Sequence, residues 1–255
     1  MKAIKIAVVG EGPTDYGNME YDKKSRKNIW KEGPIFPLIR HAAELFDHSV
    51  NIEAVDKHDV LKMRTQRSMR KLSGLDGKAN DSARFSLFLS MHGYQYGIFY
   101  CDADKEAGTK NTDVRVCQKL LQRVYSEVET GIQKMKVENQ AVVPMIPLKM
   151  IECWLMSDEK VFQELFGINS PGLPSKPELI WGAVNDPESN YPKHYLARVL
   201  NKAKGGGVEC NRDTYYEIAE RTSVLTLLEK CGISFQKFYD DFAKLLENVP
   251  DEKVG

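Results

Sequence analysis

Short apolar runs alternate with amphipathic stretches along the first 148 residues of the chain. Four runs have the length and apolar content of buried strands, at residues 3–9, 50–55, 97–101 and 140–146. The stretches between them show helical periodicity, at residues 34–46, 81–92 and 113–135. Because parallel strands need crossover connections, this order predicts an α/β fold with a mainly parallel sheet flanked by helices. The polar stretch 16–33 is expected to be a mobile loop.

Beyond residue 150 the pattern becomes mainly helical. Helices are expected at residues 150–157, 159–166, 193–204, 213–230 and 235–246, with proline and glycine interrupting the chain from 170 to 192. We therefore expect a core of residues 1–150 and a mainly helical extension of residues 151–255 packed on that core. The boundary between them is soft, since the later helices can complete the cover of the sheet.

Charge and cysteine content narrow the class of protein. The 255 residues include 36 Lys and Arg and 36 Asp and Glu, so only local clusters can argue for a polyanionic partner. The five cysteines are scattered without CxxC spacing, which favours reduced thiols over disulfides or a zinc site. No apolar stretch approaches membrane-spanning length. We expect a soluble cytoplasmic protein without a membrane partner; a homo-oligomer is compatible with the sequence.

Acidic residues follow two of the expected strands. Asp102 and Asp104 come after the run 97–101, and in extended backbone residues i and i+2 point to the same side. Glu11 follows the first strand between two glycines. Because the carboxyl ends of parallel strands share one edge, these three carboxylates are expected to meet there. Oxygen ligands suit Mg²⁺ or Mn²⁺, so the sequence predicts a metal site.

The glycines around Glu11 do not form a nucleotide-binding loop. A dinucleotide fingerprint would need a third glycine where Asp15 stands, and Glu11 would repel the pyrophosphate. The spacing of Gly12 and Gly17 is that of a P-loop, but Asn18 replaces its lysine. No organic cofactor is therefore expected.

A first strand ending in Glu11-Gly12 and a later strand followed by Asp102-x-Asp104 resemble the TOPRIM domain. Topoisomerases, bacterial primases and the nucleases of the overcoming-lysogenization-defect class share this domain. The resemblance implies a TOPRIM-like sheet and a nuclease of DNA or RNA, with Glu11, Asp102 and Asp104 as catalytic metal ligands. Two Mg²⁺ or Mn²⁺ ions would suit phosphodiester cleavage, because they stabilise the attacking and leaving oxygens.

A second resemblance extends over most of the chain. It is to a TOPRIM-like family of bacterial defence loci, often encoded beside an AAA-type or ABC-like ATPase. Four segments carry it, namely Glu11-Gly12-Pro13-Thr14-Asp15, residues 151–158, Tyr191-Pro192-Lys193 and residues 234–238. It implies the nuclease effector of an anti-phage system that works with an ATPase partner. The chain has Asp15 where many relatives carry Glu.

The defence nucleases add a downstream acid and a lysine to this pattern. By chain order the resemblance points to Glu152 or Asp158 as further metal ligands and to Lys193 as a catalytic residue that stabilises charge on phosphate. On a regular helix Glu152 and Asp158 do not share a face. Both can therefore face one site only if Glu152 lies in the turn before the helix.

Two basic stretches are candidate contacts for nucleic acid, which we expect to be DNA. Basic stretches are usually solvated faces, but with such a substrate they would bind phosphates without regard to sequence. The candidate residues are Lys23, Lys24, Arg26, Lys27, Arg64 and Arg67. Tyr16 and Trp30, beside the first stretch, could stack on bases.

Two other functions are compatible with the sequence. A nucleotide-sugar transferase would use Asp102 and Asp104 to bind a metal-diphosphate, but it leaves Glu11 and Glu152 without a role. A non-catalytic subunit that binds an ATPase is also compatible, because acidic motifs do not guarantee turnover.

Overall fold

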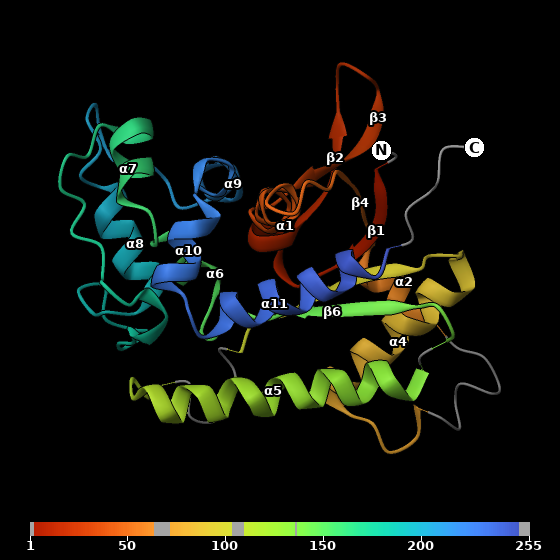
Figure 1. Ribbon diagram of the computed structural model, residues 1–255. Helices are drawn as coiled ribbons and strands as arrows, with labels where there is room; N and C mark the ends of the chain where they lie inside the picture. The colour runs from red at the N-terminus through yellow and green to blue at the C-terminus, as the bar shows by residue number, and fades with distance from the viewer. Residues whose placement is uncertain (1–2, 64–71, 104–109, 136, 250–255) are drawn as a thin grey trace.

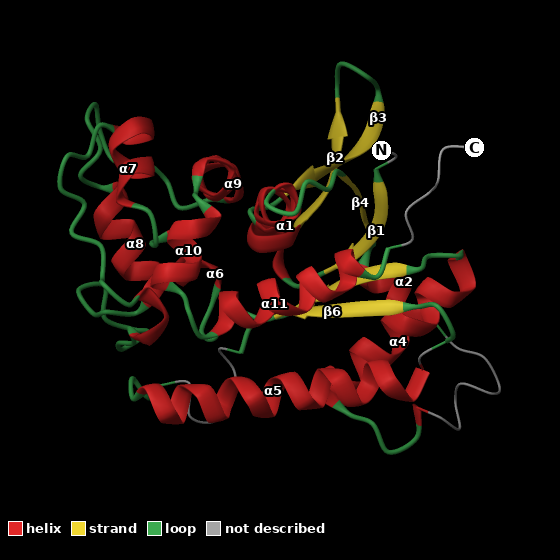
Figure 2. Cartoon of the chain, viewed as in Figure 1, coloured by secondary structure: helices red, strands yellow, loops and turns green. Residues whose placement is uncertain are grey.

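Four parallel strands form the central sheet of the protein, for which we describe a computed structural model. The structure describes residues 3–63, 72–103, 110–135 and 137–249. The strands are β1 (Ile4–Val9), β4 (Val50–Ala54), β5 (Tyr96–Tyr100) and β6 (Ala141–Met145), in the order β4-β1-β5-β6. All three pairings are parallel. The prediction of a parallel α/β sheet flanked by helices is confirmed (Figures 1 and 2).

Side-chain alternation along the strands divides the core into two layers. Ile6 and Val8 of β1 and Tyr100 of β5 face the side covered by α1 and the late helices. Val9 and Phe99, from the same two strands, face α2, α4 and α5. The helices are α1 (Ile35–Glu44), α2 (Lys57–Lys62), α4 (Gly77–His92), α5 (Val114–Met135), α6 (Ile151–Leu155), α7 (Glu159–Phe166), α8 (Pro192–Leu200), α9 (Arg212–Arg221), α10 (Val224–Lys230) and α11 (Ser234–Glu247).

The segment expected to be a mobile loop is a β-hairpin, so that prediction is wrong. Strands β2 (Gly17–Asp22) and β3 (Lys27–Glu32) pair antiparallel, with Met19 opposite Trp30. The ribbon extends away from the central sheet, above α1 in Figure 1. Trp30 packs on Tyr16 with ring centroids 4.9 Å apart, whereas most of the other side chains are polar. Without an apolar run, the sequence carried little signal for strands.

The helical part differs from expectation in one place. The single helix expected over 213–230 is two helices, α9 and α10, because Thr222 and Ser223 adopt extended backbone angles and Ser223 is the N-cap of α10. Asp158 stabilises this break by accepting a 3.2 Å hydrogen bond from the amide of Ser223. The expected boundaries of the other helices agree with the structure to within a few residues.

One hydrophobic layer joins the sheet to the late helices. Ile6 and Met145 belong to the same buried cluster as Trp154, Phe235 and Phe242. Helix α11 runs along β6 in Figure 1, and the two elements are in contact. Residues 151–249 therefore cover one face of the sheet. Within the described part of the chain, no helix combines the length and hydropathy needed to cross a bilayer.

Candidate acidic site at the carboxyl edge of the sheet

Tyr100, the last residue of β5, lies between two carboxylates. Its hydroxyl is 2.7 Å from Oδ1 of Asp102 and 3.1 Å from Oδ2 of Asp15. Asp102 is on the same side as Tyr100 because residues two apart along an extended chain share a face. A phenol carries one proton, so at any moment it donates to only one of these oxygens. Two acidic groups therefore meet at a single donor.

A short π-helical turn, η1 (Gly12–Tyr16), brings Asp15 back toward β5. The exit of the hairpin packs against this turn so closely that a Cβ at Gly33 would lie 2.2 Å from the carbonyl oxygen of Asp15. Glycine at position 33 is thus a condition for the position of Asp15. Single π-helical turns are rare and are frequent at functional sites.

Burial and the two carboxylates reinforce the protonated state of the Tyr100 hydroxyl. Burial raises the pKa of its hydroxyl well above the ordinary value, and the neighbouring Asp102 and Asp15 carboxylates raise that pKa further. The phenol therefore remains protonated and keeps its role as a hydrogen-bond donor at physiological pH.

Glu152 and Lys193 form a second charged pair near these acids. Glu152 lies in the first turn of α6 and is 1% exposed. Its Oε1 accepts a 3.2 Å hydrogen bond from the Tyr215 hydroxyl and lies 3.9 Å from Nζ of Lys193. The Lys193 side chain comes from the start of α8 and is 56% exposed. A buried carboxylate is thus paired with a cation that reaches the solvent.

Electrostatics place the two pairs in one neighbourhood. Burial opposes the charged form of Lys193, but the carboxylates of Glu152, Asp15 and Asp102 outweigh that effect and raise its pKa above the ordinary value. Lys193 is therefore a cation at neutral pH. We call Asp15, Asp102, Glu152 and Lys193, together with Tyr100, the acidic site.

The structure brings together only part of the predicted metal-ligand set. Among the described residues, no three Asp, Glu, His or Cys side chains are arranged closely enough to hold a metal ion. Asp104 lies outside the described residues. The acidic site itself offers the carboxylate oxygens of Asp15 and Asp102 on either side of Tyr100, and oxygen is the donor type that Mg²⁺ and Mn²⁺ prefer.

Glu11 is positioned with a different set of residues. Its Oε1 lies 3.3 Å from Nζ of Lys57, and Lys57 also lies 3.5 Å from Asp81. Alternation along β1 places Glu11 on the side of Val9, which is the side covered by α2 and α4. Its carboxylate contributes to the environment of Cys101, as does that of Asp102. Glu11 is thus at the same sheet edge but is paired with Lys57.

Asp158 has a capping role. It is the N-cap of α7, where Oδ1 accepts a 3.1 Å hydrogen bond from the amide of Lys160, and its other oxygen accepts the bond from Ser223. Both carboxylate oxygens of Asp158 thus accept bonds from backbone amides, whereas Glu152 is the late acid that lies beside Lys193. Glu152 lies within α6 and not in the turn before it, and Asp158 follows the end of that helix, so the two acids are not on one continuous helix.

The four candidate nucleic-acid contacts that the structure describes lie at the end of the hairpin and are not among the residues of the acidic site. Lys23, Lys24, Arg26 and Lys27 are at the hairpin end, whereas Arg64 and Arg67 lie outside the described residues. Tyr16 is 3% exposed, and its hydroxyl bonds the backbone of Val8 and Val55. The expectation that Tyr16 stacks on bases is therefore wrong.

Sequence reasoning did not place Asp15, Tyr100, Tyr215 or Lys57 at this edge. The sequence presents Asp15 as a residue in place of a fingerprint glycine and as a departure from a family pattern, because a π-helical turn has no sequence signature that predicts its direction. Tyr100 was assigned to the strand as a core residue. Its two-residue spacing from Asp102 was an available signal, since it predicts that both side chains point to one face.

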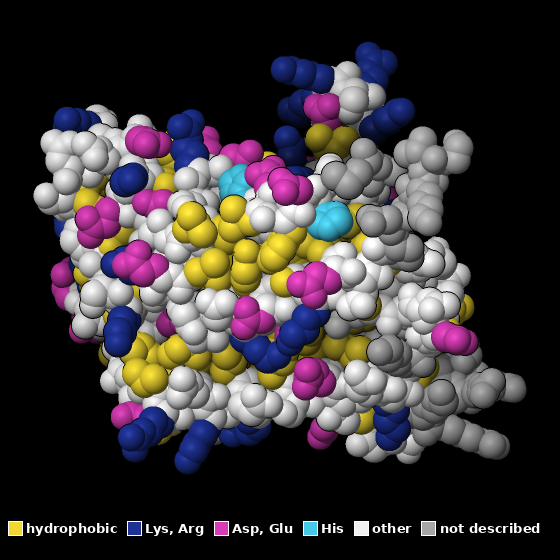
Figure 3. Space-filling view, in the orientation of Figure 1, with side chains coloured by type: hydrophobic (Ala, Val, Ile, Leu, Met, Phe, Trp, Pro, Cys, Tyr) yellow, Lys and Arg dark blue, Asp and Glu magenta, His cyan; other side chains and the backbone are white. Residues whose placement is uncertain are grey.

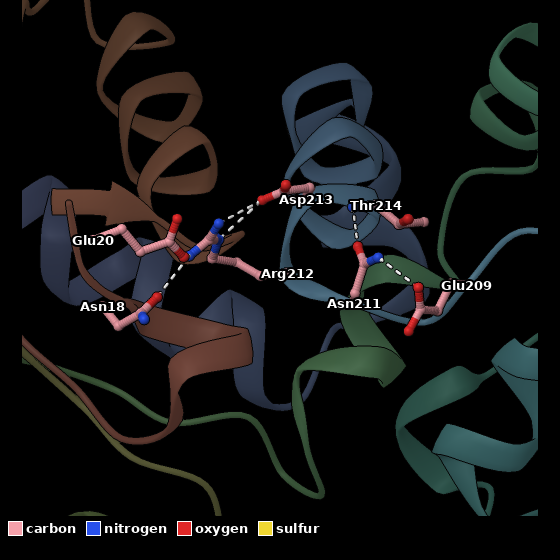
Figure 4. A network of polar contacts seen from close by, with 7 residues as sticks. All are labelled: Asn18, Glu20, Glu209, Asn211, Arg212, Asp213 and Thr214. Carbon is pink, nitrogen blue, oxygen red and sulfur yellow. Dashed lines mark hydrogen bonds and ion pairs between the residues drawn. The ribbon is translucent and has the colours of Figure 1, made fainter. Parts of the chain in front are cut away.

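A polar network connects the hairpin to the helix that supports Glu152 (Figure 4). Nη1 of Arg212, at the start of α9, lies 2.6 Å from Oδ1 of Asn18 and 2.5 Å from Oε1 of Glu20. Its other amino group bonds Asp213 at 2.8 Å. Tyr215, three residues further along α9, bonds Glu152. Helix α9 therefore contacts both the base of the hairpin and the acidic site.

Comparison of the chain with protein-family models, with curated proteins and with solved structures returned no match.

Proposed function

We propose that this protein is a divalent-metal-dependent nuclease with a TOPRIM-like fold that hydrolyses phosphodiester bonds in DNA. The observation that carries the proposal is the convergence of Asp15 and Asp102 on the Tyr100 hydroxyl, beside the Glu152–Lys193 pair. This acidic site lies at the carboxyl edge of a parallel sheet, which is where ligands of α/β proteins bind. The sequence resemblance to TOPRIM nucleases points to the same edge.

Asp15 and Asp102 would hold a Mg²⁺ or Mn²⁺ ion, with Asp104 as a third ligand by its place in the sequence. Two carboxylates around one hydroxyl repel each other, and a divalent cation would offset that repulsion. When bound, such an ion supplies positive charge for phosphate oxygens and lowers the pKa of a water molecule. Glu11 remains a proposed metal ligand at the same edge of the sheet, on the face that α2 and α4 cover.

Lys193 would bind the phosphate group. Its ammonium group is exposed to solvent yet is held near the buried Glu152, so its position is defined before a substrate arrives. Tyr215 orients Glu152 by its hydrogen bond and thereby supports Lys193 indirectly. A nucleotide-sugar transferase is less well supported, because it requires neither this lysine nor Glu152.

Nicking of supercoiled plasmid DNA in the presence of Mn²⁺ tests the proposal. We expect Asp15→Asn and Asp102→Asn each to lower the rate by at least about a hundredfold. The matched control is Glu164→Gln, which removes one negative charge from an exposed position on α7 and should cut at the wild-type rate. Equal cutting by wild type and Asp102→Asn would refute the assignment. Glu11→Ala tests whether the acid paired with Lys57 is also required.

The anti-phage role and the ATPase partner are proposed on the sequence resemblance. Copurification of an ATPase encoded beside this chain would support the partnership. If the complex forms but no cleavage occurs with any divalent metal, the non-catalytic subunit becomes the better description.

A further inference from the structure

The end of the β2–β3 hairpin carries a cluster of exposed positive charge, formed by Lys23, Lys24, Arg26 and Lys27. In Figure 3 the dark blue side chains gather on this projection, at the top of the view. No carboxylate of the described residues forms an ion pair with any of the four. In contrast, Lys57 pairs with both Glu11 and Asp81. The charges at the hairpin end are therefore available to an outside partner.

The turn that displays these charges is ordered by its own hydrogen bonds. The two carboxylate oxygens of Asp22 accept bonds from the amides of Lys24, at 3.1 Å, and Ser25, at 2.9 Å. Arg26 has a φ of 54°, in the left-handed region that favours glycine or asparagine. An arginine at this position has a conformational cost, and such costs are concentrated at functional positions. The side chain at this corner of the turn is thus a candidate contact.

The base of the hairpin is attached to the body at two points. Arg212 of α9 bonds Asn18 and Glu20 on β2. Arg40 of α1 donates from Nη2 to both carboxylate oxygens of Glu32 on β3, at 2.6 and 2.7 Å. Both strands are therefore fixed where they leave the body. The ribbon has a defined direction, so that its end is presented at a defined place.

The ribbon also exposes an apolar face. Met19 is 51% exposed and Tyr21 is 62% exposed, and residues two apart on a strand lie on the same face. An aromatic ring beside a row of cations suits a polymer of phosphates and planar bases, because the ring can stack while the cations bind phosphate. A partner that was only acidic would need the cations but not the ring.

We propose that the hairpin is a nucleic-acid-binding arm, which holds the DNA backbone at a fixed distance from the acidic site. The arm begins at Gly17, two residues after Asp15, and a six-residue strand spans about 20 Å. That length corresponds to about six base pairs at 3.4 Å each. The inference deepens the proposed nuclease function by assigning the substrate contact, and it rests on that function only for the choice of DNA.

Binding of a labelled 30-base-pair DNA duplex, followed by fluorescence anisotropy without divalent metal, tests the arm separately from cleavage. The test variant changes Lys23, Lys24, Arg26 and Lys27 to Gln. The turn should persist, because the bonds that order it involve Asp22 and backbone amides. The matched control changes four basic residues exposed on α5, Arg115, Lys119, Arg123 and Lys134, to Gln. Circular dichroism checks the folding of both proteins.

We expect the hairpin variant to lose affinity by at least about tenfold at 100 mM salt. Each phosphate contact adds about 0.9 to the slope of log affinity against log salt, so four lost contacts should reduce that slope by about 3 to 4. Tyr21→Ala should weaken binding with no change in slope, because stacking releases no counterions. The α5 control should bind like the wild type.

Equal affinity of the hairpin variant and the wild type, or an equal loss in the α5 control, would overturn the proposal. Absence of DNA binding by the wild type would also overturn it and would point to an acidic protein as partner. The proposed nuclease can fail independently: if Asp102→Asn cuts like the wild type but the hairpin variant loses binding, the arm stands and the catalytic assignment does not.

Discussion

Arg212 and Tyr215 lie one turn apart on α9 and bond two separate parts of the molecule. Arg212 is bound to Glu20 at the base of the hairpin, whereas Tyr215 is bound to the buried Glu152 of the acidic site. A single helix therefore sets the position of the proposed binding arm relative to the proposed catalytic residues. The η1 turn supplies a second connection, because it joins Asp15 directly to β2.

We predict that Arg212→Ala loosens the hairpin and costs about 1–2 kcal/mol of unfolding free energy, because charge-assisted bonds are lost from a side chain that is 14% exposed. Hydrogen–deuterium exchange should become faster in residues 17–32. Arg221→Ala, at the exposed end of the same helix, is the control and should leave exchange in the hairpin unchanged. Unchanged hairpin exchange in Arg212→Ala would show that the network does not anchor the ribbon.

Lys193→Met should reduce stability in a pH-dependent way. Because the pKa of Lys193 is raised in the folded state, its charge contributes stability below the unfolded-state pKa of about 10.4, and this contribution is lost as pH rises through the folded-state value. The difference in unfolding free energy between wild type and variant should therefore be largest near pH 7 and should shrink above about pH 10.4. Urea titrations across this range measure it. The same change at Lys119, exposed on α5, should give no such pH dependence.

Glu178→Gln should destabilise the protein at pH 7 by about 1–3 kcal/mol. Glu178 is 2% exposed and accepts bonds from the amides of Ile233 and Ser234 at the start of α11, from the Ser234 hydroxyl and from the Trp154 indole. All of these partners are donors, and the amide group of glutamine would place a donor against a donor. Equal or higher stability of the variant in urea unfolding would contradict this account.

Glu178 also gives a pH dependence of the opposite sense to that of a carboxylate whose pKa is lowered by folding. Burial raises the pKa of Glu178, so the folded state retains its proton above the unfolded-state value of about 4.3. Its contribution to unfolding free energy should thus fall as pH rises from about 4.3 through the folded-state pKa. Glu178→Gln should remove this component from the wild-type pH profile.

The Asp158→Ala and Asp158→Asn variants test whether Asp158 is a helix cap or a catalytic acid. We expect a loss of about 1–2 kcal/mol in unfolding free energy, because the N-cap of α7 and the bond to Ser223 are removed together. Asp158→Asn keeps one acceptor oxygen and should recover only the part of that stability that comes from one of the two bonds. Plasmid nicking by folded Asp158→Asn should match the wild type. A large loss of cutting in this variant would return Asp158 to the set of metal ligands.

The sheet could be predicted because its four strands are short apolar runs with helices between them, a pattern that buried parallel strands require. The β2–β3 hairpin could not be predicted in the same way, because most side chains of its two strands are polar. Trp30 of β3 packs on Tyr16, but one such contact is not a strand pattern. For Asp158 the sequence supports a capping role, because an Asp directly before a helical pattern is a common N-cap signal, as well as the ligand role that the resemblance implies.

The sequence predicted the location of the acidic site and some of its residues, but not Asp15 or Tyr100. The carboxyl edge of the sheet followed from strand order, and Asp102, Glu152 and Lys193 followed from the resemblance. The partner of Glu11 depended on which face of the edge it occupies, and therefore on helix α2 supplying Lys57. The position of Asp15 depended on the η1 turn and on its close contact with Gly33.

The contact between β6 and α11 has a consequence for synthesis on the ribosome. Val143 and Met145 of β6 remain uncovered until the residues of α11, almost a hundred positions later, have emerged. At about 5–20 residues per second the nascent chain would expose this apolar strand for several seconds. Truncation before Ser234 would make that exposure permanent, so chaperone dependence and aggregation of shortened chains are the expected result.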